Sequence, residues 1–599
     1  MKNSDLSEPE DGDSENESGK AAVPKVEIRT AHSRPPLEAW LTRRRALFIV
    51  FILWAFVYLP GLGTQELKGE EARRILPART MIETGDYVLP QIGGQPYNRK
   101  PPLINWAIAA SFKLTGIQNE WTARAPSALF VLILGLGITC AAGALAKSPL
   151  VGMLAAIFLL TSAAIFDKGR LAEIEPLYIA CTALAFGTWS ASWVNKGNPW
   201  VTWFVPGIFL GLGMLAKGPV HLLFYYVPVC WCLAISNRWN QLVSREHLAS
   251  LIPLIAPVAV WGAMVSKRTA EVSSTAPKSG DVWLDQLIGR IAPENFDLFS
   301  WIFTPFEVLI NFLPWFLLLL VFLYRVRAVR RNGAPLGTFT DDRDPERLKQ
   351  WVIGTAWGTG LTALAITLLP SSEARYADPG LPAAAILLAL ATARLNPQVK
   401  PDRDVLLGWR SINRVLLAIA AAILLCLPPV TLFAISWQFD SAAWFALGCI
   451  DCVLLIALGF IVARRGTPAT QAIASACLAS TIAILFAAAV LPAAKSEDDV
   501  RPIGEEINAA LPEDAQLCVL NPGIRPFLFY VEPGYTETIR SSEIPEDTTH
   551  VLTPRRIYQE KLLLPDFKAL EPKELIGIVD KRDEDFVLLQ LGGDEPEEE

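Results

Sequence analysis

The sequence predicts an all-α polytopic membrane protein with about thirteen spanning helices, followed by a small C-terminal α/β domain. Three observations lead to this fold class. The chain of 599 residues is 52% hydrophobic and only 19% charged, a low charged fraction for a soluble domain. The apolar residues fall in blocks of about 17–25, the length that crosses a bilayer as a helix. The final segment, 493–599, is mostly polar and holds short strand-like runs.

The N-terminal segment 1–42 is acidic and serine-rich, with little apolar surface to bury. Such a composition predicts a disordered cytoplasmic tail. The cluster Arg43–Arg45 then precedes the first apolar block, as in an uncleaved signal anchor. The membrane domain is expected over 43–492, with spans near 46–62, 126–145, 149–166, 174–194, 200–216, 219–236, 248–266, 307–325, 350–370, 380–395, 413–436, 442–463 and 470–492.

The distribution of Lys and Arg predicts the orientation of these spans. With a cytoplasmic N-terminus, alternation places Lys or Arg in all six inner loops, as the positive-inside rule requires. An even number of helices would break this pattern in the second half of the chain. The sequence therefore predicts a multi-pass protein of the inner (plasma) membrane, with the loop 63–125 and the soluble domain 493–599 on the extracytoplasmic side.

The C-terminal domain is expected to combine a helix with several strands. The segment 503–511 has a helical pattern, and the segments 516–520, 550–554, 574–579 and 585–591 are short apolar runs typical of strands. We expect this small α/β domain to be an accessory cap.

Composition also excludes some functions. A net charge of −7 without a basic, aromatic-rich domain excludes a nucleic-acid binder. The four histidines and nine cysteines show no metal-ligand spacing. A structural zinc site is therefore not expected. No cofactor is expected to be required, although the adjacent pair Glu70 and Glu71 leaves a divalent metal possible.

The first outer loop, 63–125, carries the most informative charges. Glu70 and Glu71 follow the first span, Arg73 and Arg74 come within one turn, and Lys100 precedes two prolines. The segment 70–84 predicts a short helix, and 103–115 predicts an apolar helix too short to span, as in interfacial helices. By charge alone, the loop also fits a solvated segment that anchors at the headgroups.

Several motifs together resemble the GT-C membrane glycosyltransferases, in particular the branch of protein O-mannosyltransferases and lipid A aminoarabinose transferases. The resemblance extends over roughly 46–395. The stretches that carry it are Gly69–Arg73, Thr84–Tyr87, Lys100–Leu103 with Trp106, Asn119–Leu129, Leu215–Pro219, Asn311–Trp315 and Ser371–Tyr376.

This resemblance implies a GT-C fold and the inverting transfer of a sugar from a polyprenyl-phosphate donor to an acceptor on lipid A, another envelope glycan or a protein Ser or Thr. The reaction needs a carboxylate that takes the acceptor proton and cations that face the leaving phosphate. Glu70 is the expected base, with Glu71 as its neighbour or substitute. The expected donor contacts are Arg73, Tyr97, Lys100, Lys217, Arg375 and Tyr376. Possible sugar or acceptor contacts are Asp167, Arg170, Glu173 and Glu175.

The chain departs from the family pattern at three positions. Glu70 stands where the family usually has Asp, Arg74 where Tyr is frequent, and Arg99 where the aminoarabinose transferases have Glu. These departures leave the sugar and the acceptor open. A lipid-linked sugar flippase and a non-catalytic membrane scaffold are the alternative functions. A flippase would favour paired ionisable residues and broken helices at mid-bilayer, whereas this chain gathers its charged motifs at one face.

Overall fold

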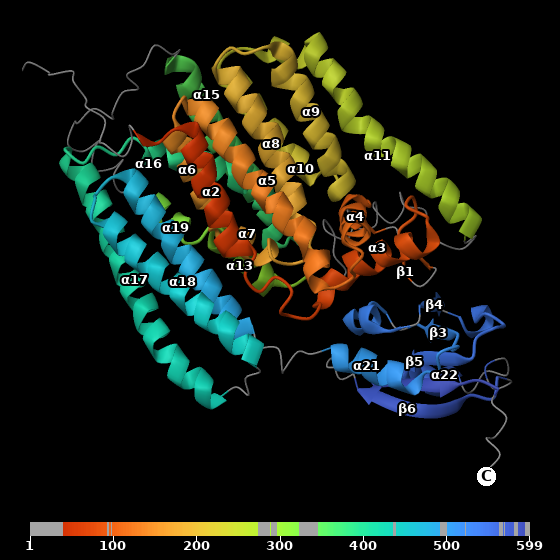
Figure 1. Cartoon of the computed structure of the whole chain (residues 1–599). Coiled ribbons are helices and arrows are strands. Elements are labelled where there is room, and N and C mark those ends of the chain that lie inside the picture. Colours follow the sequence, from red (N-terminus) through yellow and green to blue (C-terminus); the bar gives the residue numbers. More distant parts are fainter. Residues whose placement is uncertain are drawn as a thin grey trace, which may run out of the picture. The chain divides into compact units, whose positions relative to one another are not determined.

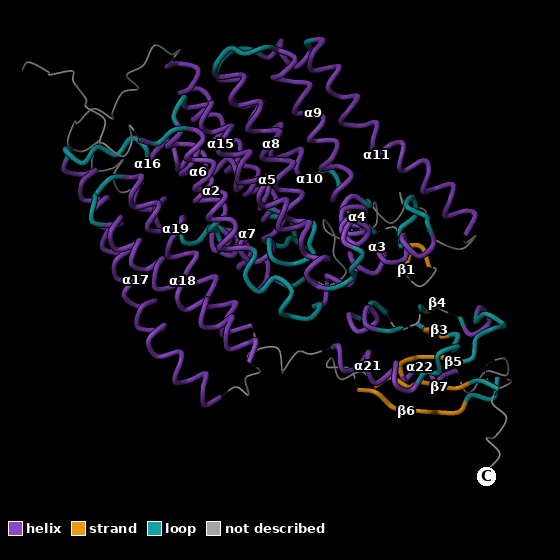
Figure 2. Tube along the Cα trace, in the orientation of Figure 1, coloured by secondary structure: helices purple, strands orange, loops and turns teal. Residues whose placement is uncertain are grey.

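The computed structural model describes residues 40–592 apart from 93–94, 98, 273–287, 289–295, 323–344, 435–438, 492–499, 522, 533, 539, 562–566, 568–569 and 580–584. The predicted disordered tail lies outside the described residues, except for its last three positions. Helices dominate the chain up to residue 491, and strands concentrate in the C-terminal domain (Figure 2).

Each of the thirteen expected spans coincides with helix in the described part of the chain, which confirms the all-α membrane fold class. The helices are α2 (Arg43–Tyr58), α5 (Glu120–Ala146), α6 (Pro149–Leu160), α8 (Glu175–Val194), α9 (Pro199–Ala216), α10 (Val220–Ile235), α11 (Arg245–Val272), α13 (Leu298–Asn311), α15 (Pro345–Thr367), α16 (Leu381–Thr392), α17 (Lys400–Ala434), α18 (Phe439–Ala463) and α19 (Pro468–Leu485). Within the described residues, seven helices are long and apolar enough to cross a membrane, or eight with one bent pair. The count of thirteen crossings therefore stays a prediction.

The bent pair differs from the continuous span expected at 307–325. Helix α13 and the helix Trp315–Phe322 meet at 92°. Pro314 lies between them, and proline breaks a helix because it lacks an N–H donor and its ring collides with the preceding turn. The end of α13 is joined to the site region, since Asn311 Nδ2 donates to Asp378 Oδ1 at 2.8 Å.

The helices pack in two connected groups (Figure 1). In the first group, α5 packs against α6 and α8, α8 packs against α9, α9 packs against α11, and α10 packs against α15. In the second group, α17, α18 and α19 pack together, and α19 contacts α2 and α6. Small residues permit close approach between such helices. A Cβ on Gly152 of α6 would lie 2.3 Å from the carbonyl oxygen of Thr139 on α5.

The first outer loop folds into several short elements. They are η1 (Gly69–Glu71), α3 (Ala72–Thr84), the hairpin β1 (Gln91–Ile92) with β2 (Gln95–Pro96), and α4 (Leu103–Thr115). The short helices expected at 70–84 and 103–115 are therefore confirmed. Gly85 ends α3 with a φ of 72°, a left-handed conformation that glycine adopts without strain.

The C-terminal domain is a five-stranded mixed sheet in the order β4-β3-β5-β7-β6. Strands β3, β4 and β5 are parallel, and β7 pairs antiparallel with β5 and β6. The predicted helix and four predicted strands are confirmed, whereas β4 and α22 were not predicted. The elements are α21 (Arg501–Ala510), β3 (Leu517–Leu520), η6 (Pro526–Tyr530), β4 (Tyr535–Thr538), η7 (Ser541–Glu543), β5 (His550–Pro554), α22 (Arg555–Lys561), β6 (Lys573–Val579) and β7 (Asp585–Gln590).

The two faces of this sheet bury different neighbours. Alternate residues of β3 point to opposite faces, so Cys518 joins a core with Ile557 of α22, while Val519 joins a core with Ile507 of α21. The second core continues into the first outer loop, where it includes Ile75 and other apolar residues of α3 and α4. The C-terminal domain therefore shares a hydrophobic core with the loop.

Two buried carboxylates of the helical part also hold the C-terminal domain. Glu66 Oε2 accepts the backbone N–H groups of Val500 and Arg501 at 2.6 Å each. Glu120 Oε1 accepts Nη2 of Arg501 at 2.5 Å and the hydroxyl of Tyr530 at 2.8 Å. We call these five residues the domain clamp. The clamp fixes the start of α21 to Glu66, which lies four residues before Glu70 in the chain.

Candidate active site

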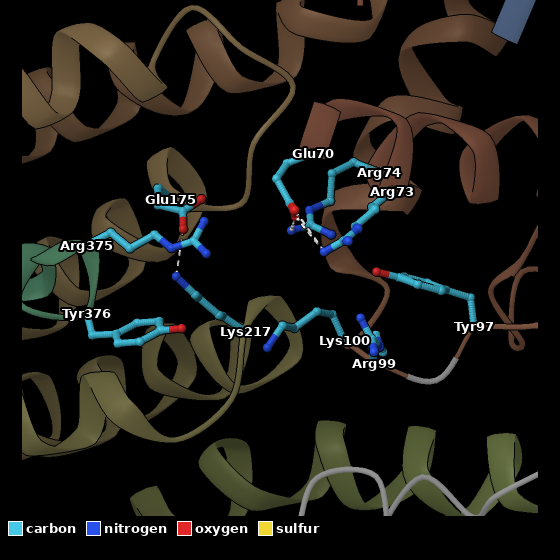
Figure 3. Close-up of a pocket in the computed structure, with 10 residues that line it drawn as sticks. All are labelled: Glu70, Arg73, Arg74, Tyr97, Arg99, Lys100, Glu175, Lys217, Arg375 and Tyr376. Atoms are coloured by element: carbon cyan, nitrogen blue, oxygen red, sulfur yellow. Dashed lines mark hydrogen bonds and ion pairs between the residues drawn. The ribbon is translucent and has the colours of Figure 1, made fainter. Parts of the chain in front are cut away.

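A polar cavity of about 250 Å³ lies where five separate segments meet (Figure 3). The segments are η1 with α3, the stretch after β2, the start of α8, the α9–α10 turn, and η3 (Ala374–Tyr376). Six cations, two carboxylates and two tyrosines line the cavity, and this excess of cations predicts an anionic ligand. The lining residues are Glu70, Arg73, Arg74, Tyr97, Arg99, Lys100, Glu175, Lys217, Arg375 and Tyr376.

Helical spacing places three of these residues on one face. Glu70, Arg73 and Arg74 stand at i, i+3 and i+4 in consecutive helical turns, so their side chains are neighbours. The Arg73 guanidinium lies 2.8 Å from Glu70 Oε1, and Arg74 Nη2 lies 3.8 Å from Oε2. The side chain of Glu70 is 40% exposed, so a ligand in the cavity can reach its carboxylate.

A tight turn directs Lys217 into the cavity. Helix α9 ends at Ala216, Gly218 follows with a φ of 110°, and α10 begins after Pro219. The carbonyl of Gly218 accepts the Tyr178 hydroxyl at 3.0 Å, which fixes the turn. Lys217 Nζ lies 2.7 Å from Glu175 Oε1 and 5.3 Å from the centre of the Tyr376 ring.

The short helix η3 supplies Arg375 and Tyr376 from the late loop. Glu373 accepts the Tyr376 hydroxyl at 2.7 Å and pairs with Arg375 Nε at 2.6 Å. Burial lowers the pKa of Arg375, but the carboxylates of Glu373 and Glu175 outweigh it and raise the pKa overall. In Figure 3, Arg375 and Tyr376 lie on the left of the view, Glu70 lies near the centre, and Tyr97 lies on the right.

Eight of the residues predicted from the sequence meet at this cavity. They are Glu70, Arg73, Tyr97, Lys100, Glu175, Lys217, Arg375 and Tyr376. Arg74 and Arg99 also line it, although neither was predicted as a site residue. For Arg74 a signal was available, because it stands four residues after Glu70 in a predicted helix. Arg99 is the chain neighbour of Lys100.

Glu71 is the first correction to the predicted site, because its carboxylate is buried outside the cavity. Arg124 Nε and Nη2 donate to its two oxygens at 2.8 and 2.9 Å. The backbone N–H groups of Ala172 and Lys68 donate to the same oxygens at 2.8 and 3.0 Å. With both oxygens occupied, Glu71 positions the loop and is not placed to act as a base.

Three further predicted contacts lie outside the cavity lining. Asp167 pairs with Lys168 at 2.9 Å and its side chain is 63% exposed. Arg170 is buried and donates to the carbonyls of Val57, at 2.6 Å, and Pro60. Arg170 therefore holds the end of the first span, while a ligand contact of the exposed Asp167 stays a prediction.

Glu173 stands behind the cavity wall. Its Oε2 lies 3.9 Å from Arg74 Nε, and both atoms are buried without a hydrogen-bond partner among the described residues. Burial raises the pKa of Glu173 from 4.5 to about 7, and the carboxylate of Glu175 adds to the rise. Glu173 is thus a titratable neighbour of Arg74.

No group of three or more His, Cys, Asp or Glu side chains that could hold a metal ion occurs in the part of the chain that the structure describes.

The chain resembles known transferases in sequence. Residues 99–261 match the model of the family described as dolichyl-phosphate-mannose-protein mannosyltransferase. The undecaprenyl phosphate-alpha-4-amino-4-deoxy-L-arabinose arabinosyl transferase of Edwardsiella ictaluri is 24% identical over 283 residues, which cover 47% of this chain and 49% of that protein. The transferase of the same name from Pectobacterium atrosepticum is 24% identical over 45% of this chain and 48% of its own length. The matched stretch thus spans about half of these relatives.

A solved structure covers far more of the chain. ArnT from Cupriavidus metallidurans, bound to undecaprenyl phosphate, superimposes with a TM-score of 0.61 at 17% identity, over 92% of this chain and 98% of that one. The chain has the GT-C fold. The resemblance to the mannosyltransferase and aminoarabinose transferase type, first seen in the outer-loop motifs, is confirmed. Within this GT-C fold, the family match includes Lys100, Glu175 and Lys217, while Glu70 and Arg375 lie outside it.

Proposed function

We propose that the chain transfers a sugar from a polyprenyl-phosphate donor to an acceptor hydroxyl at the extracytoplasmic face of the membrane. The observation that carries the proposal is the cavity itself, in which one accessible carboxylate, Glu70, stands among six cations. The named relatives are transferases that use an undecaprenyl-phosphate sugar, and the similar ArnT structure holds undecaprenyl phosphate. Lipid A, another envelope glycan or a protein Ser or Thr would serve as acceptor.

In the proposed reaction, Glu70 removes the proton from the acceptor hydroxyl as its oxygen attacks the anomeric carbon. The bond from that carbon to the phosphate oxygen breaks, and the polyprenyl phosphate leaves with the electron pair. Lys100, Lys217 and Arg375 neutralise the charge that develops on the leaving oxygen. Attack from the side opposite the leaving phosphate inverts the anomeric centre.

Arg73 has two partners in this scheme. It lies 2.8 Å from Glu70 and lines the same cavity, so a bound phosphate competes with Glu70 for its guanidinium. Binding of the donor would then release the Glu70 carboxylate toward the acceptor. The donor phosphate thereby prepares the base.

The proposal places the protein in the inner (plasma) membrane with its N-terminus in the cytoplasm and the C-terminal domain outside.

The proposed reaction requires no cofactor, because Lys and Arg supply the positive charge that a metal would otherwise bring. Treatment with EDTA should leave transfer unchanged. A loss of transfer that Mg²⁺ or Mn²⁺ restores would add a metal to the mechanism. The names of the curated relatives favour transfer over the flippase alternative.

The decisive experiment measures transfer in proteoliposomes that contain a polyprenyl-phosphate sugar and an acceptor. Glu70→Gln should lower the rate by about 10²–10⁴-fold, the contribution of a general base, while Glu70→Asp should retain part of the activity. Glu505→Gln changes an exposed carboxylate of α21 and serves as the matched control. A Glu70→Gln protein that transfers at the wild-type rate would reject Glu70 as the base. Movement of the intact donor lipid across the bilayer without transfer would favour the flippase.

A further inference from the structure

A second, larger groove lies far from the candidate active site. Its volume is about 630 Å³, within the range of about 300–1,000 Å³ that is typical of small-molecule sites. It is formed by the first residue of α2 and by the facing ends of α5, α8 and α9. The lining residues are Arg43, Gly137, Cys140, Ala141, Ala144, Lys147, Leu184, Thr188, Ala191, Ser192, Asn195, Gly197, Asn198 and Val201.

Helix α8 connects the two sites. Its first residue, Glu175, lines the cavity, and Asn195, directly after its last residue, lines the groove. A helix of 20 residues is about 30 Å long at 1.5 Å per residue, which equals the hydrocarbon thickness of a typical bilayer. The groove therefore lies at the membrane interface opposite the candidate active site.

Two cations stand at the groove. Arg43 begins α2, and Lys147 follows the last residue of α5. Arg43 Nη2 donates a hydrogen bond to the thiol of Cys140 at 3.3 Å. Among the described residues, neither Arg43 nor Lys147 forms an ion pair with a carboxylate. Their charges are therefore available to an anion.

The wall between these cations suits an acyl chain. On α5 it consists of small residues, including Gly137, Ala141 and Ala144, and on α8 it includes Leu184 and Ala191. Asn195 and Asn198 add polar groups to the same lining, as a headgroup requires. The site thus combines an apolar trough with a cationic, polar end.

We propose that this groove binds an anionic phospholipid of the leaflet opposite the candidate active site, with the phosphate between Arg43 and Lys147 and an acyl chain along α5 and α8. Basic pockets between transmembrane helices recognise such headgroups. Lipid binding in this groove does not depend on the transfer reaction. With the orientation that the positive-inside rule predicts, the lipid belongs to the cytoplasmic leaflet.

Native mass spectrometry of the purified full-length protein tests the site with phosphatidylglycerol and phosphatidylcholine at equal concentration. The wild type should bind phosphatidylglycerol about tenfold more tightly, a preference in line with two cations at a membrane surface. The double variant Arg43→Gln/Lys147→Gln should lose this preference. The matched control Arg464→Gln/Arg465→Gln removes the same charge from an exposed pair outside the groove and should keep it.

Ala144→Phe tests the trough without changing any charge. Ala144 is exposed in the groove wall, so the larger side chain should fill the trough and weaken phosphatidylglycerol binding at least fivefold. It also gives a readout if the double variant fails to fold. Undiminished lipid binding by either groove variant would overturn the proposal. The proposal would also be overturned if the control variant Arg464→Gln/Arg465→Gln lost the preference for phosphatidylglycerol to the same extent. Binding of inorganic phosphate alone as tightly as phosphatidylglycerol would overturn it as well.

Discussion

The carboxylate of Glu71 and the guanidinium of Arg124 form a doubly hydrogen-bonded pair, at 2.8 and 2.9 Å, whose side chains are only 1% and 2% exposed. The remaining N–H groups of Arg124 donate to the carbonyls of Leu62, Gln65 and Glu66. This one arginine on α5 therefore holds the whole entrance of the first outer loop. Glu70, the neighbour of Glu71, is left facing the cavity.

The pair predicts that Glu71→Gln destabilises the fold, whereas Glu70→Gln leaves the fold stable and lowers the rate of transfer. Removal of one charge from a buried ion pair costs about 3–5 kcal/mol, so the Glu71→Gln protein should show a strongly lowered Tm and yield in detergent. Glu70→Gln should keep a Tm close to the wild type. A Glu71→Gln protein with normal stability and no transfer would instead make Glu71 catalytic.

The cation excess predicts that single substitutions weaken donor binding. Lys100→Gln should raise the Kd for a polyprenyl phosphate about tenfold, because hydrogen bonds to charged groups contribute about 1.5–3 kcal/mol. Lys113→Gln is the matched control, since Lys113 is exposed on α4 and stacks over Tyr87 at 4.8 Å, outside the cavity. Direct binding of a labelled polyprenyl phosphate provides the measurement. Equal affinities in the wild type and Lys100→Gln would remove Lys100 from the phosphate site.

Glu173 predicts a pH dependence of stability. Its pKa in the folded protein is raised to about 7 from 4.5, first by burial. Between these values the folded state holds a proton that the unfolded state has lost, so stability falls as the pH rises from about 4.5 to 7 and then levels off. The variant Glu173→Gln should not show this loss of stability with rising pH, because glutamine does not titrate.

Thermal unfolding between pH 5 and pH 8 checks the sign. The Tm of the wild type, relative to that of Glu173→Gln, should decrease as the pH rises. The exposed Asp404→Asn should follow the wild type at every pH. A difference between wild type and Glu173→Gln that stays constant across this range would contradict the assignment.

The domain clamp predicts that the C-terminal domain supports the site. The side chains of Glu66 and Glu120 are 5% and 6% exposed, so Arg501→Gln removes a guanidinium that faces both buried carboxylates. Amide hydrogen exchange should become faster in α21 and in η1, and transfer should fall. Arg556→Gln, an exposed i,i+4 partner of Glu560, should change neither. Normal exchange in η1 of the Arg501→Gln protein would show that the clamp does not support the loop.

The sequence was sufficient to locate the membrane helices and most of the residues that line the cavity, because apolar block length and local motifs are short-range signals. It could not separate Glu70 from Glu71. Consecutive residues of a 3₁₀ turn point about 120° apart, and the partner that turns Glu71 inward is Arg124, 53 positions along the chain. Strand β4 was missed because its residues Tyr535–Thr538 are mostly polar, so its pairing depends on β3 and not on its own pattern.

The domain clamp joins residues that are synthesised at very different times. Glu66 is made early in translation, yet the N–H groups that its carboxylate accepts come from Val500 and Arg501, 434 and 435 positions later. Every membrane helix described here precedes that point in the chain. A nascent or truncated protein can thus occupy the bilayer while its outer loop still lacks these bonds. Under the proposed function, transfer would begin only after the C-terminal domain is made, so copies that lack this domain would not consume donor lipid.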